Sequence, residues 1–112
     1  GVQNLVFMLN VNGKQIVIPG DAWPGPELFA RIGAWSSKPD VLIAPFPLIG
    51  LPSGRRMMGK HLKPGHILAL HLPQPEMDEQ NWVASAKAVC KRMEDGIPMP
   101  DFGEILGKEY HY

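Results

Sequence analysis

The sequence of 112 residues contains a single cysteine and no excess of charge of either sign. One cysteine cannot form an internal disulfide, which is typical of a reducing compartment. Eleven basic side chains balance eleven acidic ones, so the chain lacks the basic surface with which proteins bind nucleic acids or anionic membranes. No apolar run approaches the roughly 20 residues that span a bilayer, and no secretory leader is recognisable. We therefore expect a cytoplasmic protein without nucleic-acid or membrane partners.

Several catalytic motifs are also missing. The sequence has no Gly-rich phosphate loop, no Ser-His-Asp order and no signature of paired carboxylates. Its composition, 45% apolar and 20% charged, is ordinary for a globular protein and fits one domain over residues 1–112. The chain begins with Gly1 and not with methionine, which we interpret as a removed tag or as a piece of a longer protein.

Two short apolar segments on either side of an Asn-Gly pair at residues 12–13 predict an N-terminal β-hairpin. Pairing across a two-residue turn places Phe7 opposite Ile18 on one face of this hairpin. Far from the turn both faces are apolar, whereas near the turn one face is polar. We therefore expect an inner pair of strands that is covered on both sides at one end only.

Strands and helices alternate along the rest of the chain, which predicts an α/β domain with a largely parallel sheet after the hairpin. The expected elements are a helix after Pro24 and Pro26 that ends at Gly33, a buried strand at 41–44, a loop at 50–54, a weak helix at 55–62, a strand at 66–70, a helix at 79–93 with Asp78 as its N-cap, and an edge strand or extended arm within 97–112.

Three of the predicted strands are followed closely by candidate functional residues, namely Asp21, Phe46 and His71. In open α/β sheets, ligands bind outside the carboxyl ends of the strands. We therefore expect these three residues to share one rim. Phe46 and the nearby Trp23 are expected to pack or to form a pocket wall.

Three segments resemble the second half of the metallo-β-lactamase fold superfamily, especially its lactonase-like and other metal-dependent hydrolase branches. They read Val-Ile-Pro-Gly-Asp at 17–21, Asp-Val-Leu-Ile-Ala-Pro at 40–45 and Leu-Lys-Pro-Gly-His-Ile-Leu-Ala-Leu-His at 62–71. The resemblance covers about residues 5–93 and implies half of an αββα sandwich. It also implies that Asp21 bridges two metal ions and that His71 binds the second.

Two departures from that family stand out. Many members carry His-His-Gly or a similar polar segment after the strand that here ends at Pro45, and this chain has Phe-Pro-Leu-Ile-Gly instead. The first-half motif His-x-His-x-Asp-His is absent. Catalytic zinc sites use three protein ligands and an open position, whereas Asp21 and His71 supply two at most. The roles of His61 and His66 stay open.

The resemblance thus implies the C-terminal half of a larger domain that hydrolyses a small-molecule ester, lactone, thioester or phosphodiester by attack of a metal-bound hydroxide. Zinc or another divalent metal ion, in a binuclear centre, would be the cofactor. The partner would be the missing N-terminal half, and this chain alone is not expected to be active.

A second interpretation is a metal-free structural or interaction domain that buries its open sheet face against another copy, giving a homo-oligomer. Asp21 would then be a turn carboxylate that accepts hydrogen bonds from backbone amides. His71 would be a strand-end histidine that is hydrogen-bonded to a backbone carbonyl. Arg55 and Arg56 could clamp a phosphate or carboxylate, although an exposed charged helix end is favoured. Cys90 is expected to be a buried, inert thiol.

Overall fold

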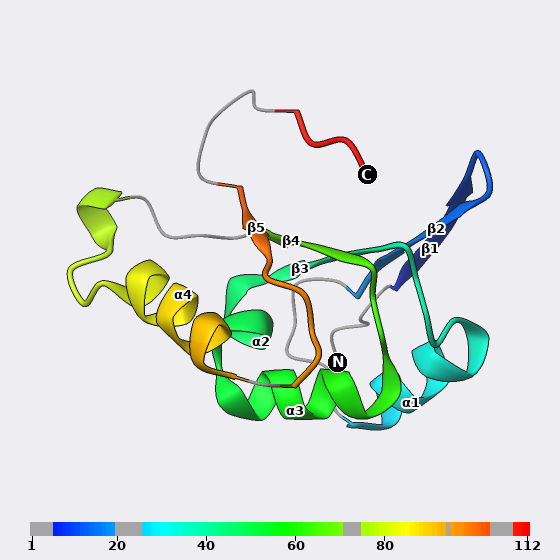
Figure 1. The fold of residues 1–112 in the computed structure, drawn as a ribbon, viewed down its shortest axis with the longest axis horizontal. Helices are drawn as coiled ribbons and strands as arrows, with labels where there is room; N and C mark the ends of the chain where they lie inside the picture. Colours follow the sequence, from blue (N-terminus) through cyan, green and yellow to red (C-terminus); the bar gives the residue numbers. More distant parts are fainter. Residues whose placement is uncertain (1–5, 20–25, 71–74, 94, 104–108) are drawn as a thin grey trace, which may run out of the picture.

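The computed structural model describes residues 6–19, 26–70, 75–93, 95–103 and 109–112. These residues form an α/β fold with a mixed five-stranded sheet and four α-helices (Figure 1). In chain order the elements are β1 (Phe7–Val11), β2 (Lys14–Ile18), α1 (Pro26–Trp35), β3 (Val41–Pro45), α2 (Phe46–Gly50), α3 (Pro52–His61), β4 (His66–Leu70), a 3-10 turn (Pro75–Met77), α4 (Trp82–Arg92) and β5 (Asp101–Phe102).

The strands follow one another across the sheet in chain order, from β1 at one edge to β5 at the other. β1 is antiparallel to β2, and all later pairs are parallel. Phe7 lies opposite Ile18, and the turn residues Asn12 and Gly13 have positive φ angles of 50° and 81°. These angles are those of a type I′ turn, whose twist matches that of the two strands. The predicted hairpin and the parallel arrangement after it are confirmed.

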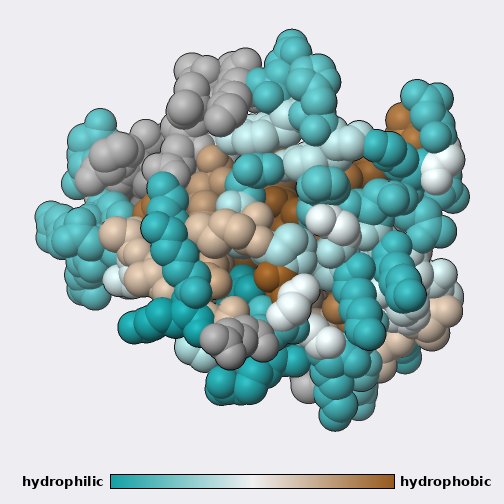
Figure 2. Space-filling view, in the orientation of Figure 1, coloured by the Kyte–Doolittle hydropathy of each residue, from teal (hydrophilic) through white to brown (hydrophobic). Residues whose placement is uncertain are grey.

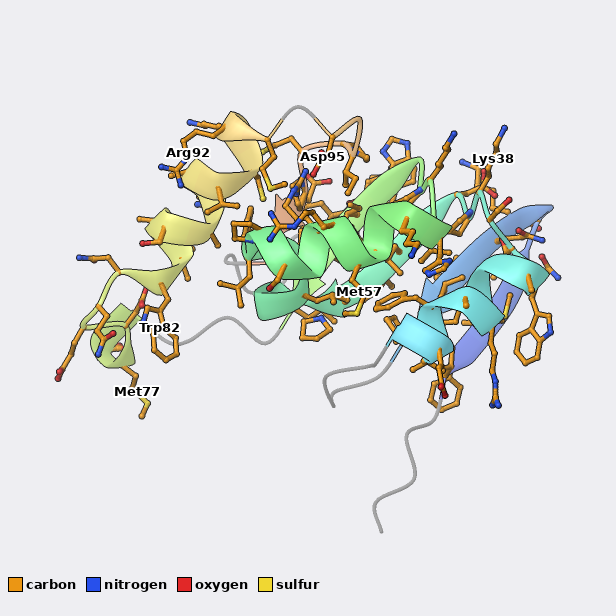
Figure 3. All side chains as sticks on the ribbon, turned by 90° about the horizontal axis from the view of Figure 1, so that it is seen from below. Lys38, Met57, Met77, Trp82, Arg92 and Asp95 are labelled. Atoms are coloured by element: carbon orange, nitrogen blue, oxygen red, sulfur yellow. The ribbon has the colours of Figure 1, made fainter. Side chains whose placement is uncertain are left out.

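All four helices cover the same face of the sheet (Figures 1 and 3). Right-handed crossovers between neighbouring parallel strands place each connecting helix on the same side. One buried cluster fills the space between the helices and this face. Its members are Val17, Phe29, Ile32, Leu42, Ala44, Leu48, Ile49, Met58, Leu62, Ile67, Ala69, Ala86, Cys90 and Phe102.

The opposite face of the sheet, which we call the open sheet face, carries no helix among the described residues. Because side chains alternate along a strand, the register assigns its members. They are Phe7, Leu9 and Val11 on β1, Lys14, Ile16 and Ile18 on β2, Val41, Ile43 and Pro45 on β3, and His66, Leu68 and Leu70 on β4.

The expectation that the hairpin is an inner strand pair, covered on both sides at one end, is wrong for β1. This strand is the outermost of the strands that the structure describes, and Phe7 is 52% exposed. The physical reason is that one helix layer can cover only one face of a sheet. The space-filling view shows brown hydrophobic residues at the surface between teal hydrophilic ones (Figure 2).

Two helix boundaries differ from the predicted ones. α1 passes through Gly33 and ends at Trp35, because Gly33 packs against α3, where an added Cβ would lie 2.7 Å from the carbonyl oxygen of His61. The predicted loop at 50–54 instead contains the end of α2 and the start of α3. Pro52 opens α3, where a proline's missing donor costs nothing.

The last long helix also begins later than predicted. The N-cap residue is Asn81 and not Asp78, but the carboxylate of Asp78 accepts hydrogen bonds from the backbone N–H groups of Trp82 (2.6 Å) and Val83 (3.3 Å), the first two residues of the helix. Asn81, however, has a left-handed backbone with a φ angle of 55°, which delays the first helical residue to Trp82. Trp82 is 54% exposed. The prediction that it belongs to the buried face of α4 is therefore wrong. Among the described residues, no helix is long and apolar enough to cross a membrane.

Candidate functional site

The carboxyl ends of β2, β3 and β4 lie at one edge of the sheet, because the three strands are parallel neighbours. Pro45 and Leu70, the last residues of β3 and β4, are paired directly. Phe46 follows at once as the first residue of α2, and its side chain lies outside the described part. The expected convergence of three strand ends is therefore present in the backbone.

The two predicted metal ligands, Asp21 and His71, lie outside the described residues. Their meeting at the rim stays a prediction. Within the described ranges, no group of three or more His, Cys, Asp or Glu side chains is arranged to hold a metal ion. His66 begins β4 and stacks on Tyr112, with ring centroids 4.6 Å apart, and His61 ends α3.

A buried arginine forms the most connected polar group among the described residues. Arg55 on α3 is fully buried, and its guanidinium makes a bidentate ion pair with Asp95, with Nε to Oδ2 at 2.9 Å and Nη2 to Oδ1 at 3.0 Å. It also donates to the carbonyls of Ile49 (3.3 Å) and Ile97 (3.4 Å) and to the Cys90 sulfur (3.2 Å). This group, the Arg55 cluster, joins α2, α3, α4 and the segment that leads into β5.

The expectation of an exposed, charged helix end at Arg55 is thus wrong, and so is the alternative of a free anion clamp there. The buried guanidinium has no donor directed to solvent, since the carboxylate of Asp95 and three further acceptors surround it. Arg56, its neighbour, is exposed. The spacing of Arg55, Met58 and Leu62 at i, i+3 and i+7 places them on one helix face, and that signal could have predicted the burial.

The carboxyl group of Asp95 is tuned by two opposing effects. Burial raises its pKa, but the hydrogen bonds from Arg55 and from the Ile97 N–H (3.0 Å), together with the charge of Arg55, outweigh burial and hold the pKa of Asp95 below its usual value. The ionised form is therefore the one that the fold stabilises.

This lowered pKa predicts a loss of stability in acid. A carboxyl whose pKa is depressed on folding contributes its full stabilisation above its unfolded pKa of about 3.9, and the contribution disappears as the pH falls through the folded pKa. We expect the urea midpoint of unfolding to fall as the pH drops from about 5 to about 3, the range in which this stabilisation begins to be lost. The fall should be shallower in Asp95→Asn, which has no carboxyl group at this position. Equal slopes in the two proteins would contradict the assignment.

Cys90 is buried, as predicted. Burial raises the pKa of its thiol, and the nearby Arg55 lowers it only in part. A thiol that stays protonated at neutral pH is a poor nucleophile. We expect native protein to react with a thiol reagent such as DTNB far more slowly than urea-unfolded protein, by at least about 100-fold given the raised pKa and burial. Comparable rates in the two states would show that the thiol is accessible and activated.

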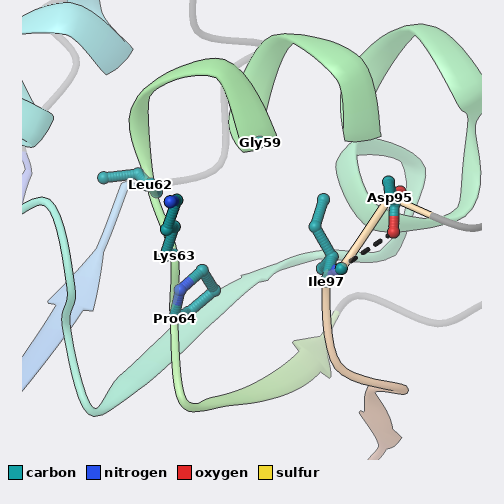
Figure 4. A pocket seen from close by; sticks show the side chains of 7 residues that line it. Gly59, Leu62, Lys63, Pro64, Asp95 and Ile97 are labelled. Atoms are coloured by element: carbon teal, nitrogen blue, oxygen red, sulfur yellow. Dashed lines mark hydrogen bonds between the residues drawn. The ribbon is translucent and has the colours of Figure 1, made fainter.

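A shallow pocket of about 320 Å³ adjoins the Arg55 cluster (Figure 4). It is lined by Gly59, Leu62, Lys63, Pro64, Asp95, Gly96 and Ile97. Lys63 and Asp95 stand on opposite sides of it, but both oxygens of Asp95 are already held by Arg55 and the Ile97 N–H. The pocket is at the lower limit of size for a small-molecule site. Lys63 is the one exposed cationic residue among the described residues in its lining.

The C-terminal segment, residues 109–112, lies on part of the open sheet face (Figure 1). The hydroxyl of Tyr112 donates to Asp101 (2.5 Å), and that of Tyr110 donates to the Phe102 carbonyl (3.1 Å). Lys14 donates to the backbone oxygen of Tyr112. Burial and the hydrogen bond to the negative charge of Asp101 raise the pKa of Tyr112. These contacts fall near the amino ends of the strands, away from the rim.

The geometry therefore offers two surfaces for function, the rim at the carboxyl ends of β2 to β4 and the open sheet face. Asp95 was not singled out by sequence reasoning, because nothing local marks a carboxylate that pairs with an arginine 40 positions earlier. No family model, curated protein or solved structure matches the chain.

Proposed function

We propose that this chain is the C-terminal part of a metal-dependent hydrolase with a metallo-β-lactamase-like fold, in which Asp21 and His71 bind metal. The observation that carries the proposal is the parallel pairing of β2, β3 and β4, whose ends precede Asp21, Phe46 and His71 in sequence. Ligand sites of open α/β sheets lie at such an edge. A helix layer on one face and an apolar opposite face also suit half of an αββα sandwich.

The two side chains are of the right chemical kind for zinc, which takes carboxylate and imidazole ligands. Bound zinc would lower the pKa of water toward ~7 and stabilise the negative charge that develops on the substrate oxygen. The chain's own contribution would be to hold a carboxylate and an imidazole after β2 and β4, the two strands that flank β3. The further ligands would come from a segment with the His-x-His-x-Asp-His motif, and the substrate would be a small ester, lactone, thioester or phosphodiester.

Calorimetric zinc titration tests this proposal. We expect weak binding to the chain alone and tight binding once it is joined to a polypeptide that supplies the missing motif. Asp21→Ala and His71→Ala should each weaken that tight binding by more than ~100-fold, since even outer-shell changes cost 10–100-fold. His111→Ala is the matched control, because the side chain of His111 is 86% exposed. A joined protein that binds no zinc would end the proposal.

A second candidate function is favoured by the open sheet face. Its large side chains include Phe7, Leu9 and Val11 on β1, which are 45–52% exposed, and exposed apolar side chains that gather on one face mark an interaction site. The chain would then act as a metal-free interaction domain. Native mass spectrometry distinguishes the two: an assembly without metal, unaffected by Asp21→Ala but dissociated by Ile43→Lys on the open sheet face, supports this candidate. A monomer would contradict it.

A further inference from the structure

The two edges of the sheet are built differently. At one edge, β5 is only two residues long, follows Pro98 and Pro100, and begins with the charged Asp101. Short length, proline and charge are the means by which proteins keep an edge strand from pairing with another chain. At the other edge, β1 has five residues, Phe-Met-Leu-Asn-Val, with neither a charge nor a proline. Only β1 is thus left open to pairing among the described strands.

The backbone of β1 presents hydrogen-bonding groups on its outer side. In the turn at 12–13, the carbonyl of Val11 faces the N–H of Lys14 on β2. Backbone groups of successive residues point to alternate sides of a strand. The N–H and C=O groups of Met8 and Asn10 therefore point away from β2, and no described strand pairs with them.

We propose that β1 pairs with β1 of a second copy of this chain, antiparallel and centred on Leu9, so that one sheet runs through both copies. In this register Met8 and Asn10 exchange backbone hydrogen bonds across the two-fold axis. Phe7 lies opposite Val11 of the second copy, and Leu9 lies opposite Leu9. The inference is independent of the hydrolase proposal, because it uses the strand edge and neither the rim nor a metal.

The pattern of side chains argues for a second copy as the occupant. A two-fold interface must be complementary to itself, and the apolar residues Phe7, Leu9 and Val11 are symmetric about the centre of the strand. They are 52%, 45% and 49% exposed. Pairing would set each against an apolar residue, and such cross-strand pairs stabilise a sheet. The formal net charge of zero adds no long-range repulsion between copies.

A charge exchange tests the register. Phe7→Lys combined with Val11→Glu gives two opposite-charge pairs across the axis, whereas Phe7→Glu combined with Val11→Glu gives two like-charge pairs. Residue 11, which faces Lys14 within the same hairpin, is the same in both variants. Both variants remove the same two exposed apolar side chains, so each is the control for the other. We expect the first to dimerise and the second to have a dissociation constant at least about ten-fold higher by sedimentation equilibrium.

A cross-link gives a second measurement that does not depend on affinity. In the proposed register Leu9 faces its own copy in a non-hydrogen-bonded pair, where Cα atoms lie about 4.5 Å apart, within reach of a disulfide. We expect Leu9→Cys to form covalent dimers under mild oxidation, and Val11→Cys, which faces Phe7, to form few. Equal dissociation constants for the two charge variants, or equal cross-linking of the two cysteine variants, would overturn the proposal.

Discussion

Asp95→Ala is expected to lower the free energy of unfolding by about 3–5 kcal/mol, because it leaves the fully buried guanidinium of Arg55 without its counter-charge. The loss is large beside the roughly 5–15 kcal/mol that stabilises a typical domain. Urea denaturation followed by tryptophan fluorescence at pH 7 measures it. Glu76→Ala, at an exposed carboxylate, is the matched control and should change little.

A double substitution separates the charge from the packing. In Arg55→Met with Asp95→Leu, the buried charge is gone and most of the volume is kept, and such replacements of a buried ion pair are often neutral. We expect the double variant to be more stable than Asp95→Ala. A double variant that is less stable would mean that the hydrogen bonds to Ile49 and Ile97 matter more than the ion pair.

Gly54→Ala is the second large effect that we expect, with a loss of at least about 3 kcal/mol, at the upper end of what overpacking costs. A Cβ at Gly54 would lie 2.2 Å from the carbonyl oxygen of Leu48, so α2 and α3 would have to move apart. At an exposed helix position the same change would gain up to about 1 kcal/mol from helix propensity.

Thermal unfolding of Gly54→Ala beside Ser53→Ala measures this contact. Ser53 is the preceding residue of α3 and is exposed, so its substitution should leave the melting temperature nearly unchanged. A Gly54→Ala protein as stable as the parent would show that the two helices can separate at little cost.

Local signals were sufficient for much of the fold. The Asn-Gly pair fixes the hairpin register because only one turn type suits its positive φ angles. The apolar runs that became β3 and β4 are bounded by Pro and Gly, and alternation with helices makes the sheet parallel. These features depend on residues that are close together in the chain.

What the sequence left unpredicted depends on distant contacts. The short helix α2 has no periodic pattern of its own, and it is stabilised by packing of Gly50 against Ala86, where an added Cβ would lie 2.4 Å away. Arg55 is buried only because Asp95 returns to it after 40 residues. For the candidate metal site, the strand ends follow from topology, but the positions of Asp21 and His71 lie outside the described residues.

The position of Tyr112 has a practical consequence for anyone who handles the protein. Its ring rests on His66 and its backbone oxygen is held by Lys14, so the backbone leaves this residue directly above the strands. An affinity tag or fluorescent label fused there would start beside His66 and Lys14 on the open sheet face and would sterically shield that face from a binding partner. Probes for pull-down or surface plasmon resonance are therefore better attached at exposed Met77, in the 3-10 turn that precedes α4 in the chain.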